Sequence, residues 1–135
     1  MISSFRLTYV IILIQIYKTL IFNFMTTDQR LDIVLEALDD LKGINIQTID
    51  VEHLTDMMDK IVISTASSTT HTKALAKNLE QELKNNEITI LGIEGDNKSD
   101  WVLVDIGDIV VHIMLEATRD LYALEKLWDI KRIDN

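Results

Sequence analysis

Apolar residues recur every three or four positions in three stretches of the chain, a spacing typical of the buried side of an amphipathic helix. The stretches are residues 28–42, 70–85 and 116–128. Thr26 or Thr27 can cap the first helix with a side-chain oxygen, and Gly43 is expected to end it. Leucines at helical spacing mark the buried face of the second helix: Leu75, Leu79 and Leu83.

Shorter apolar runs between the helices predict five strands. They cover about residues 45–51, 60–65, 87–93, 101–105 and 109–114. The element order αββαβββα predicts an α/β fold, in which helices flank a mixed five-stranded sheet. With 135 residues, the chain is long enough for one domain with one core.

The last two predicted strands are apolar on both faces. In the first of them, Trp101 and Leu103 point one way and Val102 and Val104 point the other. A strand at the surface would show a polar residue at every second position. Both faces are therefore expected to be covered, either by helices of the same fold or by helices on one side and a partner protein on the other.

Residues 1–24 differ from the rest because they are rich in Ile, Leu, Phe and Tyr and contain no acidic side chain. A spanning helix needs roughly 20 mostly apolar residues, and Lys18 would lie well inside such a span. Met25 is a natural start for the protein, because a capped amphipathic helix follows it directly. We expect translation to begin at Met25 and residues 25–135 to form the domain, with a membrane anchor in residues 1–24 as the alternative.

Acidic residues dominate the predicted domain. All 22 lie at or after Asp28, whereas Arg6 and Lys18 precede it, so residues 25–135 carry 11 basic side chains and a formal charge of −11. Such a surface repels the phosphate backbone, and direct nucleic-acid binding is not expected. The charge suits a basic partner protein, although solubility alone also accounts for it.

Residues suited to catalysis are scarce. The absence of Cys excludes disulfides, thiolate chemistry and Cys-ligated zinc, and the sequence has no glycine-rich phosphate loop. His53, His71 and His112 are far apart and lack metal-ligand spacing. His112 lies within a strand and is expected to be a hydrogen-bonded structural histidine. We therefore expect no catalytic residue, no metal and no cofactor.

A polar run from Ser64 to His71 precedes the second helix. The positive end of a helix dipole can bind an anion, so this run is a candidate anion site. The same hydroxyl residues are also natural helix caps. The cap is the favoured interpretation.

Two blocks of sequence carry a resemblance to a known family. The first, WVLVDIGDIVVH, covers residues 101–112, and the second, RDLYALEKLW, covers residues 119–128. In order, spacing and direction they resemble the ribosomal silencing factor family (RsfS, also called iojap or YbeB). The resemblance extends over about residues 29–129 and is strongest over residues 100–128.

The resemblance implies a fold related to nucleotidyltransferases and a role in translation. Family members bind the large ribosomal subunit through a ribosomal protein of the L-fourteen type. They block docking of the small subunit and damp translation when nutrients are scarce. They form homodimers in isolation, and bacterial members are cytoplasmic. The implied mechanism is steric, so the protein is expected to be a translational repressor and not an enzyme.

A metal-dependent enzyme of the nucleotidyltransferase type is the alternative. That chemistry needs a Gly-Ser turn to hold a triphosphate and two carboxylates, one residue apart on a strand, to hold a divalent metal. Asp50 and Glu52 have the required spacing. However, residues 66–68 read Ala-Ser-Ser, and they follow the acidic pair instead of preceding it.

Candidate partner-binding residues lie in the two blocks of the resemblance. Trp101 is an anchor of the kind enriched at interface hot spots, and Leu103 would lie beside it. Asp105 and Asp108 frame a tight turn and could pair with basic residues of the ribosomal protein. On the last helix the candidates are Tyr122, Glu125, Lys126 and Trp128. That helix either borders the same surface or closes the core, and core packing is also the alternative for Trp101.

The chain departs from the family before the second helix. Where the family usually shows Thr-Gly-Thr-Ser-Ser-Arg-His, this chain has Ala66 for Gly, Ser67 for Thr and Thr70 for Arg. Residues 54–59 are only loosely similar to the Ser-x-x-Thr-Asp segment of the family. A role of the family's arginine therefore does not carry over to Thr70.

Overall fold

The computed structural model describes residues 2–23, 25–95 and 100–133. Its elements are α1 (Ile2–Asn23), α2 (Thr27–Asp40), β1 (Ile44–Asp50), β2 (Lys60–Ala66), α3 (Thr69–Asn85), β3 (Gly92–Gly95), β4 (Trp101–Asp105), β5 (Ile109–Leu115), α4 (Glu116–Tyr122) and α5 (Leu124–Ile133). The strands form a five-stranded sheet in the order β1-β2-β5-β4-β3. The expected α/β fold with a mixed sheet and flanking helices is confirmed.

The central pair of strands, β2 and β5, is parallel, and the pairs β1–β2, β3–β4 and β4–β5 are antiparallel. The parallel register runs from Lys60 opposite Ile109 to Ala66 opposite Leu115. Both central strands therefore end at the same edge of the sheet. At this edge β4 begins, because Trp101 lies opposite Met114.

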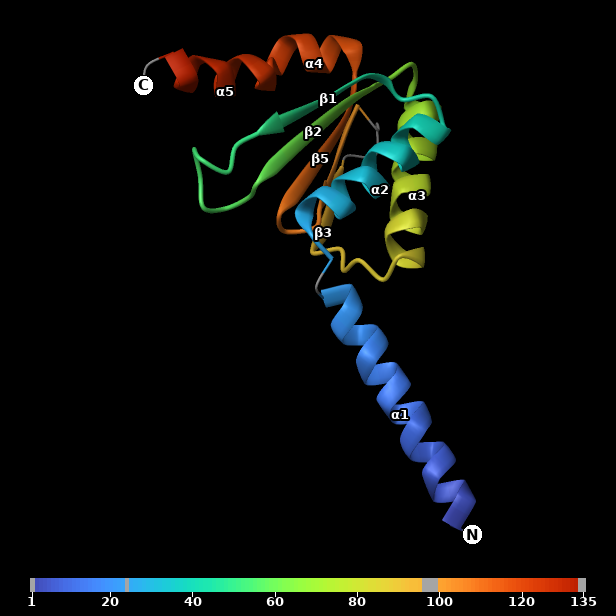
Figure 1. The fold of residues 1–135 in the computed structure, drawn as a ribbon. Coiled ribbons are helices and arrows are strands. Elements are labelled where there is room, and N and C mark those ends of the chain that lie inside the picture. Colours follow the sequence, from blue (N-terminus) through green and yellow to red (C-terminus); the bar gives the residue numbers. More distant parts are fainter. Residues whose placement is uncertain (1, 24, 96–99, 134–135) are drawn as a thin grey trace.

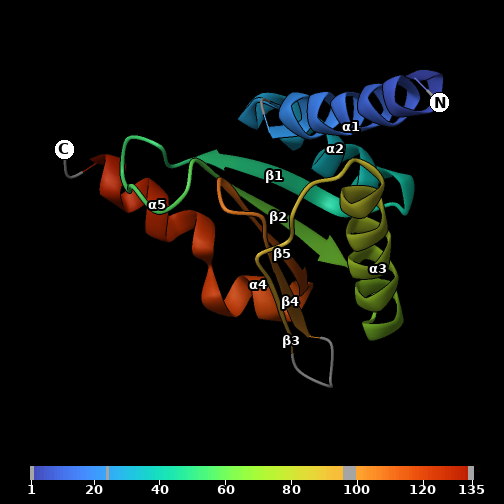
Figure 2. The same cartoon turned by 90° about the horizontal axis from the view of Figure 1, so that it is seen from below.

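Helices cover both faces of the sheet: α2 and α3 pack on one face, and α4 and α5 lie over the other (Figures 1 and 2). The leucines expected on the buried face of α3 are fully buried, which confirms that prediction. They join the larger core cluster, whose strand residues include Val62, Val104, Val111 and Ile113. Burial of these branched side chains between helix and sheet stabilises the fold.

A smaller cluster fills the opposite face of the sheet. Its buried residues are Ile49, Val51, Ile61, Ile63 and Met114. Met58, Trp101, Leu124 and Trp128 pack against it and are partly buried. The expectation that β5 is covered on both faces is thereby confirmed. In β4, by contrast, Val102 and Val104 are buried, whereas Trp101, Leu103 and Asp105 are only partly covered.

Helix α2 begins at a capping box. The Thr26 side chain accepts a hydrogen bond from the Gln29 backbone N–H, and the Gln29 side chain accepts one from the Thr26 backbone. Of the two expected caps, Thr26 is therefore the one used. Gly43 was expected to end the helix, but Lys42 instead takes the left-handed conformation, with a φ of 59°. Asp39 and Leu38 carbonyls still accept the closing hydrogen bonds.

Two expected element boundaries are wrong. The third strand was expected over residues 87–93 but covers Gly92–Gly95, because its pairing with β4 begins only at Gly92, opposite Asp105. The last helix was expected to run unbroken over residues 116–128. It is interrupted at Ala123, which has a φ of 45° and ends α4 in the left-handed conformation.

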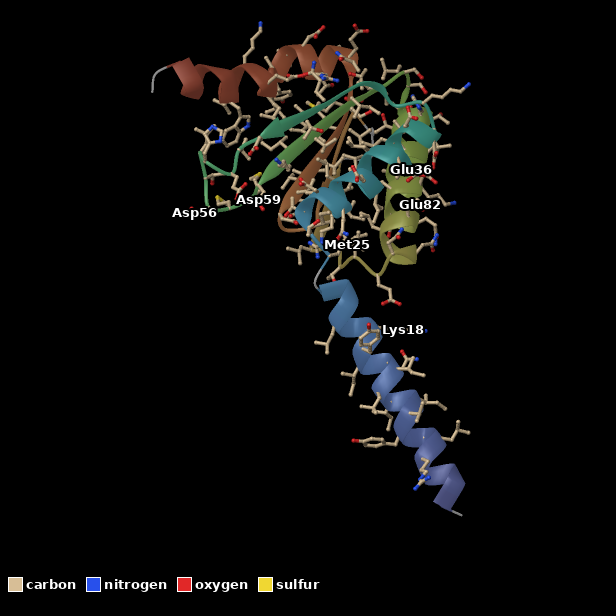
Figure 3. All side chains as sticks on the ribbon, viewed as in Figure 1. Lys18, Met25, Glu36, Asp56, Asp59 and Glu82 are labelled. Carbon is tan, nitrogen blue, oxygen red and sulfur yellow. The ribbon has the colours of Figure 1, made fainter. Side chains whose placement is uncertain are left out.

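Helix α1 extends away from the rest of the protein (Figure 1). Figure 3 shows Lys18 on this helix and Met25 where the chain enters the domain. Among the described residues of α1, large apolar side chains such as Tyr9 and Tyr17 are each 65% exposed. Within the part of the chain that the structure describes, no helix is long and apolar enough to cross a membrane. Met25 packs against the larger core cluster, and the start of translation at Met25 stays a prediction.

Candidate functional site

Three aromatic rings meet where β4 begins. The Trp101 ring centroid lies 4.8 Å from that of Tyr122 and 5.8 Å from that of His112. Tyr122 is 55% exposed, and Trp101 and Leu103 are partly exposed. Trp101 and Leu103 share a face of β4, as expected from strand alternation. We call Trp101, Leu103 and Tyr122 the aromatic surface.

His112 holds the Trp101 indole in place. The indole Nε1 donates a hydrogen bond to His112 Nδ1 at 3.0 Å, and Leu103 lies opposite His112 in the sheet register. Burial lowers the pKa of His112 to about 4, so the ring is neutral near pH 7. Because Nδ1 accepts, the remaining ring proton is on Nε2. The expected hydrogen-bonded structural histidine is confirmed.

Trp101 combines the two roles that the sequence left open. Its ring packs against the smaller cluster beneath α5, so it contributes to the core. The same ring is partly exposed and is oriented by His112 on one side and Tyr122 on the other. A large aromatic side chain held in one orientation loses little conformational entropy when it is buried against a partner.

The two aspartates of the β4–β5 turn differ in how far they are already paired. Asp105 Oδ1 accepts a hydrogen bond from the Gly107 backbone N–H at 2.8 Å, and Gly107 has a φ of 98°, so the expected tight turn is confirmed. Asp108 accepts from Arg30 Nη1 at 3.0 Å and from Thr27 Oγ1 at 2.8 Å. Asp108 therefore joins α2 to the turn, whereas Asp105 makes no ion pair with the residues that the structure describes.

The four candidates on the last helices do not lie together. Tyr122 contacts Trp101, whereas Trp128 packs against the smaller core cluster. Glu125 Oε1 accepts from Arg119 Nε at 2.7 Å, and with exposed Lys126 it lines a separate cavity. The break at Ala123 separates these positions, which one continuous helix would have kept in a common register.

Arg119 is the residue that sequence analysis missed. It is only 6% exposed, and its Nη1 donates to the Asn45 carbonyl at 2.7 Å and to Thr65 Oγ1 at 2.9 Å. Its partner Glu125 is six positions away, a separation that places two residues on different faces of a regular helix. The pair forms because the helix is interrupted at Ala123, so helical spacing in the sequence does not predict it.

Burial disfavours the charged form of Glu125, but its own backbone N–H and the Arg119 guanidinium outweigh that effect. Together they hold the pKa of the Glu125 carboxyl below its usual value. The pair is therefore ionised at neutral pH. It joins the start of α5 to α4 and, through Arg119, to β1 and β2.

The cavity has a volume of about 940 Å³ and lies at the edge of the sheet where β2 and β5 end. Its lining residues are Ile44, Asn45, Gln47, Thr65, Ala66, Ser67, Ser68, Leu115, Glu116, Arg119, Asp120, Ala123, Glu125 and Lys126. It is thus built from β1, the ends of β2 and β5, the start of α3 and both C-terminal helices.

Asp50, one of the two carboxylates that suggested nucleotidyltransferase chemistry, makes structural contacts in this fold. Asp50 is paired with Lys60 Nζ at 2.9 Å, and its Oδ1 accepts from the Glu52 backbone N–H. The hydrogen bond from Lys60 and that backbone N–H lower the pKa of Asp50. In the residues that the structure describes, no group of three or more His, Cys, Asp or Glu side chains is arranged to hold a metal ion.

The polar run before α3 acts as a cap. Ser68 is the N-cap, and its side chain accepts from the His71 backbone N–H. His71 Nδ1 accepts from the Ser67 backbone N–H at 2.9 Å, and Nε2 donates to the Leu41 carbonyl at 2.7 Å. The favoured interpretation as a helix cap is confirmed.

Comparisons with known proteins identify relatives over the whole domain. The sequence model of the family described as "Ribosomal silencing factor during starvation" matches residues 25–135. The ribosomal silencing factor RsfS of Chromobacterium violaceum is 43% identical over 96 residues, which cover 71% of this chain and 79% of that protein. The RsfS of Haemophilus influenzae is 40% identical over 97 residues, which cover 72% of this chain and 95% of that protein.

Solved structures agree with these relatives. A crystal structure of a protein from Chromobacterium violaceum matches with a TM-score of 0.76 at 40% identity, covering 78% of this chain and 88% of that chain. One from Bacillus halodurans matches with a TM-score of 0.69 at 30% identity, covering 76% and 95%. The sequence and the fold thus place this chain in the RsfS family of ribosomal silencing factors.

Proposed function

We propose that the protein represses translation by binding the large ribosomal subunit through its L-fourteen-type ribosomal protein and sterically blocking subunit joining, notably under nutrient limitation. The observation that carries this proposal is the aromatic surface. Trp101 and Tyr122 form a contiguous, partly exposed aromatic pair on the domain. Leu121, the neighbour of Tyr122 in the sequence of α4, is another exposed apolar residue, with 77% of its surface accessible. Apolar patches of this kind are typical of protein-binding sites.

The position of the aromatic surface on a rigid element favours tight binding. Trp101 is the first residue of β4 and lies opposite Met114 of the central strand β5. A preorganised anchor avoids the ordering cost that a flexible loop would incur. Truncation of such an aromatic anchor at an interface commonly costs more than about 2 kcal/mol of binding free energy.

Charge supports a basic protein as the partner. Residues 25–135 have 22 acidic and 11 basic side chains, and Figure 3 shows Glu36 on α2 and Glu82 on α3. Such a field accelerates association with a basic protein surface and disfavours approach to the RNA phosphates. Of the two aspartates at the β4–β5 turn, Asp105 is the better placed to contribute, since Asp108 already pairs with Arg30.

We further propose that inhibition involves no chemical step and no cofactor. Occupancy of the docking surface is sufficient to prevent subunit joining, so the repression scales with the fraction of large subunits bound. We expect the protein to act in the cytoplasm and to form homodimers when it is not on the ribosome. Contacts with membranes would depend on residues 1–24 being part of the expressed protein.

Co-sedimentation tests the proposed function. The full-length protein is mixed with purified large subunits, small subunits are then added, and the ribosomal species are separated on a sucrose gradient. We expect the protein to migrate with the large subunit and the peak of joined ribosomes to shrink. Absence of the folded protein from the large-subunit fractions would overturn the proposal.

A matched pair of variants assigns the binding to the aromatic surface. Trp101→Ala is expected to weaken binding at least about tenfold. Met57→Ala removes a side chain that is 81% exposed in the loop between β1 and β2, and its binding is expected to be unchanged. Equal binding by both variants would show that the aromatic surface is not the docking site.

A further inference from the structure

The cavity beside Arg119 lies where the topology of the sheet changes direction. The parallel strands β2 and β5 are neighbours and end at the same edge. The chain leaves β2 into α3 on one face of the sheet, and leaves β5 into α4 on the other face (Figures 1 and 2). In open α/β sheets, diverging connections of this kind leave a crevice at the carboxyl ends of the strands, where ligands bind.

A buried, incompletely paired cation lines this cavity. Arg119 uses Nε for Glu125 and Nη1 for Asn45 and Thr65, but Nη2 has no hydrogen-bond partner among the described residues. A buried guanidinium nitrogen without an acceptor is energetically unfavourable. An acceptor oxygen that reached Nη2 would remove this cost.

The walls of the cavity have opposite electrical character. One wall includes Ser67 and Ser68 at the start of the 17-residue helix α3, where the helix dipole and hydroxyl groups favour a negative group. Another wall is α4, where the exposed carboxylates of Glu116 and Asp120 lie one helical turn apart. These two carboxylates favour a positive group.

This combination selects against the simplest ligands. A phosphate or nucleotide would bring two or more negative charges toward the carboxylates of Glu116, Asp120 and Glu125. A divalent metal lacks a suitable cluster of ligands among the described residues. A zwitterion satisfies both walls, and a volume of about 940 Å³ is ample for it.

We propose that this cavity binds a free α-amino acid, with its carboxylate at Arg119 and its ammonium group at Glu116 and Asp120. The site is distinct from the aromatic surface and does not depend on the proposed ribosomal partner. Because Arg119 Nη2 is screened from solvent, the carboxylate reaches it by displacing a side chain at the rim. Lys126 is an exposed residue of the cavity lining.

Isothermal titration calorimetry of the full-length protein with each of the twenty standard amino acids tests this inference. We expect at least one to bind, and expect its amide and its N-acetyl derivative to bind at least about tenfold more weakly, because each lacks one of the two charges. Absence of heat from all twenty at 10 mM would overturn the proposal. Tight binding of inorganic phosphate would also overturn it, by showing a simple anion site.

Two variants locate the binding in the cavity. The double variant Glu116→Gln, Asp120→Asn changes only exposed side chains, so it is expected to fold. Circular dichroism is used to check that this variant folds, and the folded variant is expected to lose at least about tenfold in affinity for the amino acid. Asp39→Asn, which changes an exposed carboxylate on α2, is the matched control and is expected to bind normally. Equal affinity of the double variant and the control would place the ligand elsewhere and overturn the proposal.

Discussion

The indole Nε1 of Trp101 donates a hydrogen bond to Nδ1 of His112 across the β4–β5 pair, at 3.0 Å. The bond requires the neutral imidazole, because a protonated ring has no acceptor nitrogen. The orientation of the partly exposed Trp101 ring thus depends on the protonation state of a buried histidine. This relationship links the stability of the fold to the shape of the proposed docking surface.

The stability of the protein is predicted to fall at acidic pH because of His112. Its pKa is about 4 in the folded protein and 6.5 when it is unperturbed, so between these values the unfolded chain binds a proton that the folded chain does not. The contribution is fully present above pH 6.5 and is lost as the pH falls toward 4, by about 3 kcal/mol in total. Urea unfolding at a series of pH values measures it.

His112→Gln, which does not titrate, is expected to flatten that pH dependence. His53→Gln removes an exposed histidine and serves as the control. We expect its stability to depend on pH as that of the unsubstituted protein does. If the two variants had the same slope between pH 4 and 6.5, the effect would not come from His112.

The ion pair between Arg119 and Glu125 is predicted to stabilise the C-terminal helices. Glu125→Gln should lower the free energy of unfolding at pH 7 by about 2 kcal/mol, since the buried guanidinium loses its charged partner. The pKa of Glu125 is lowered in the folded protein, so this stabilisation is present above its unfolded pKa and disappears as the pH falls through the folded value. Thermal unfolding at pH 7 and at acidic pH measures both effects.

The exposed pair between Lys84 and Glu80 on α3 provides the comparison. Glu80→Gln is expected to cost only about 0.3–0.5 kcal/mol, because solvent screens exposed pairs. A loss of the same size in both variants would argue against a structural role for Arg119 and Glu125.

Replacement of Ala123 by glycine is predicted to stabilise the protein. Ala123 has a φ of 45°, where a Cβ atom costs about 1–2 kcal/mol, and glycine is free of that cost. Part of the gain is offset by the greater entropy of the unfolded chain, so we expect a net increase of about 0.5–1 kcal/mol. Denaturant midpoints measure the change.

Ala74→Gly is the matched substitution, since Ala74 is exposed within the regular helix α3. It should destabilise the protein by about 1 kcal/mol. A destabilisation by both substitutions would mean that the interruption between α4 and α5 is not strained at Ala123.

The aspartates of the β4–β5 turn are predicted to act differently when neutralised. Asp105→Asn keeps the acceptor for the Gly107 N–H but removes a charge, so it should weaken large-subunit binding and reduce its salt dependence, with stability unchanged. Asp108→Asn removes the charge that pairs with Arg30 and should lower the free energy of unfolding by about 1 kcal/mol. Binding at several salt concentrations, together with urea unfolding, separates the two effects. A stability loss at Asp105 or none at Asp108 would contradict the assignment.

Local pattern alone was enough to predict the fold class, because helix and strand periods are set by backbone geometry and every element must bury one face. The leucine face of α3, the Thr26 and Ser68 caps and the turn at Gly107 follow from interactions between residues close in sequence. Boundaries that depend on left-handed residues were not predictable, since Lys42 and Ala123 take that conformation under tertiary packing. Their side chains give no local signal for it.

The sequence by itself determined the family and the excess of acidic residues, since each depends on residue identity or order, and it singled out Trp101 as a candidate binding residue. Only the tertiary structure decided which of the candidate residues lie together and which belong to separate parts of the surface. It paired Trp101 with His112 and Tyr122, committed Asp108 to Arg30, and placed Glu125 with Arg119 in a cavity. The physical reason is that such contacts join residues distant in the chain, and their geometry depends on how the sheet register and helix packing bring those residues together.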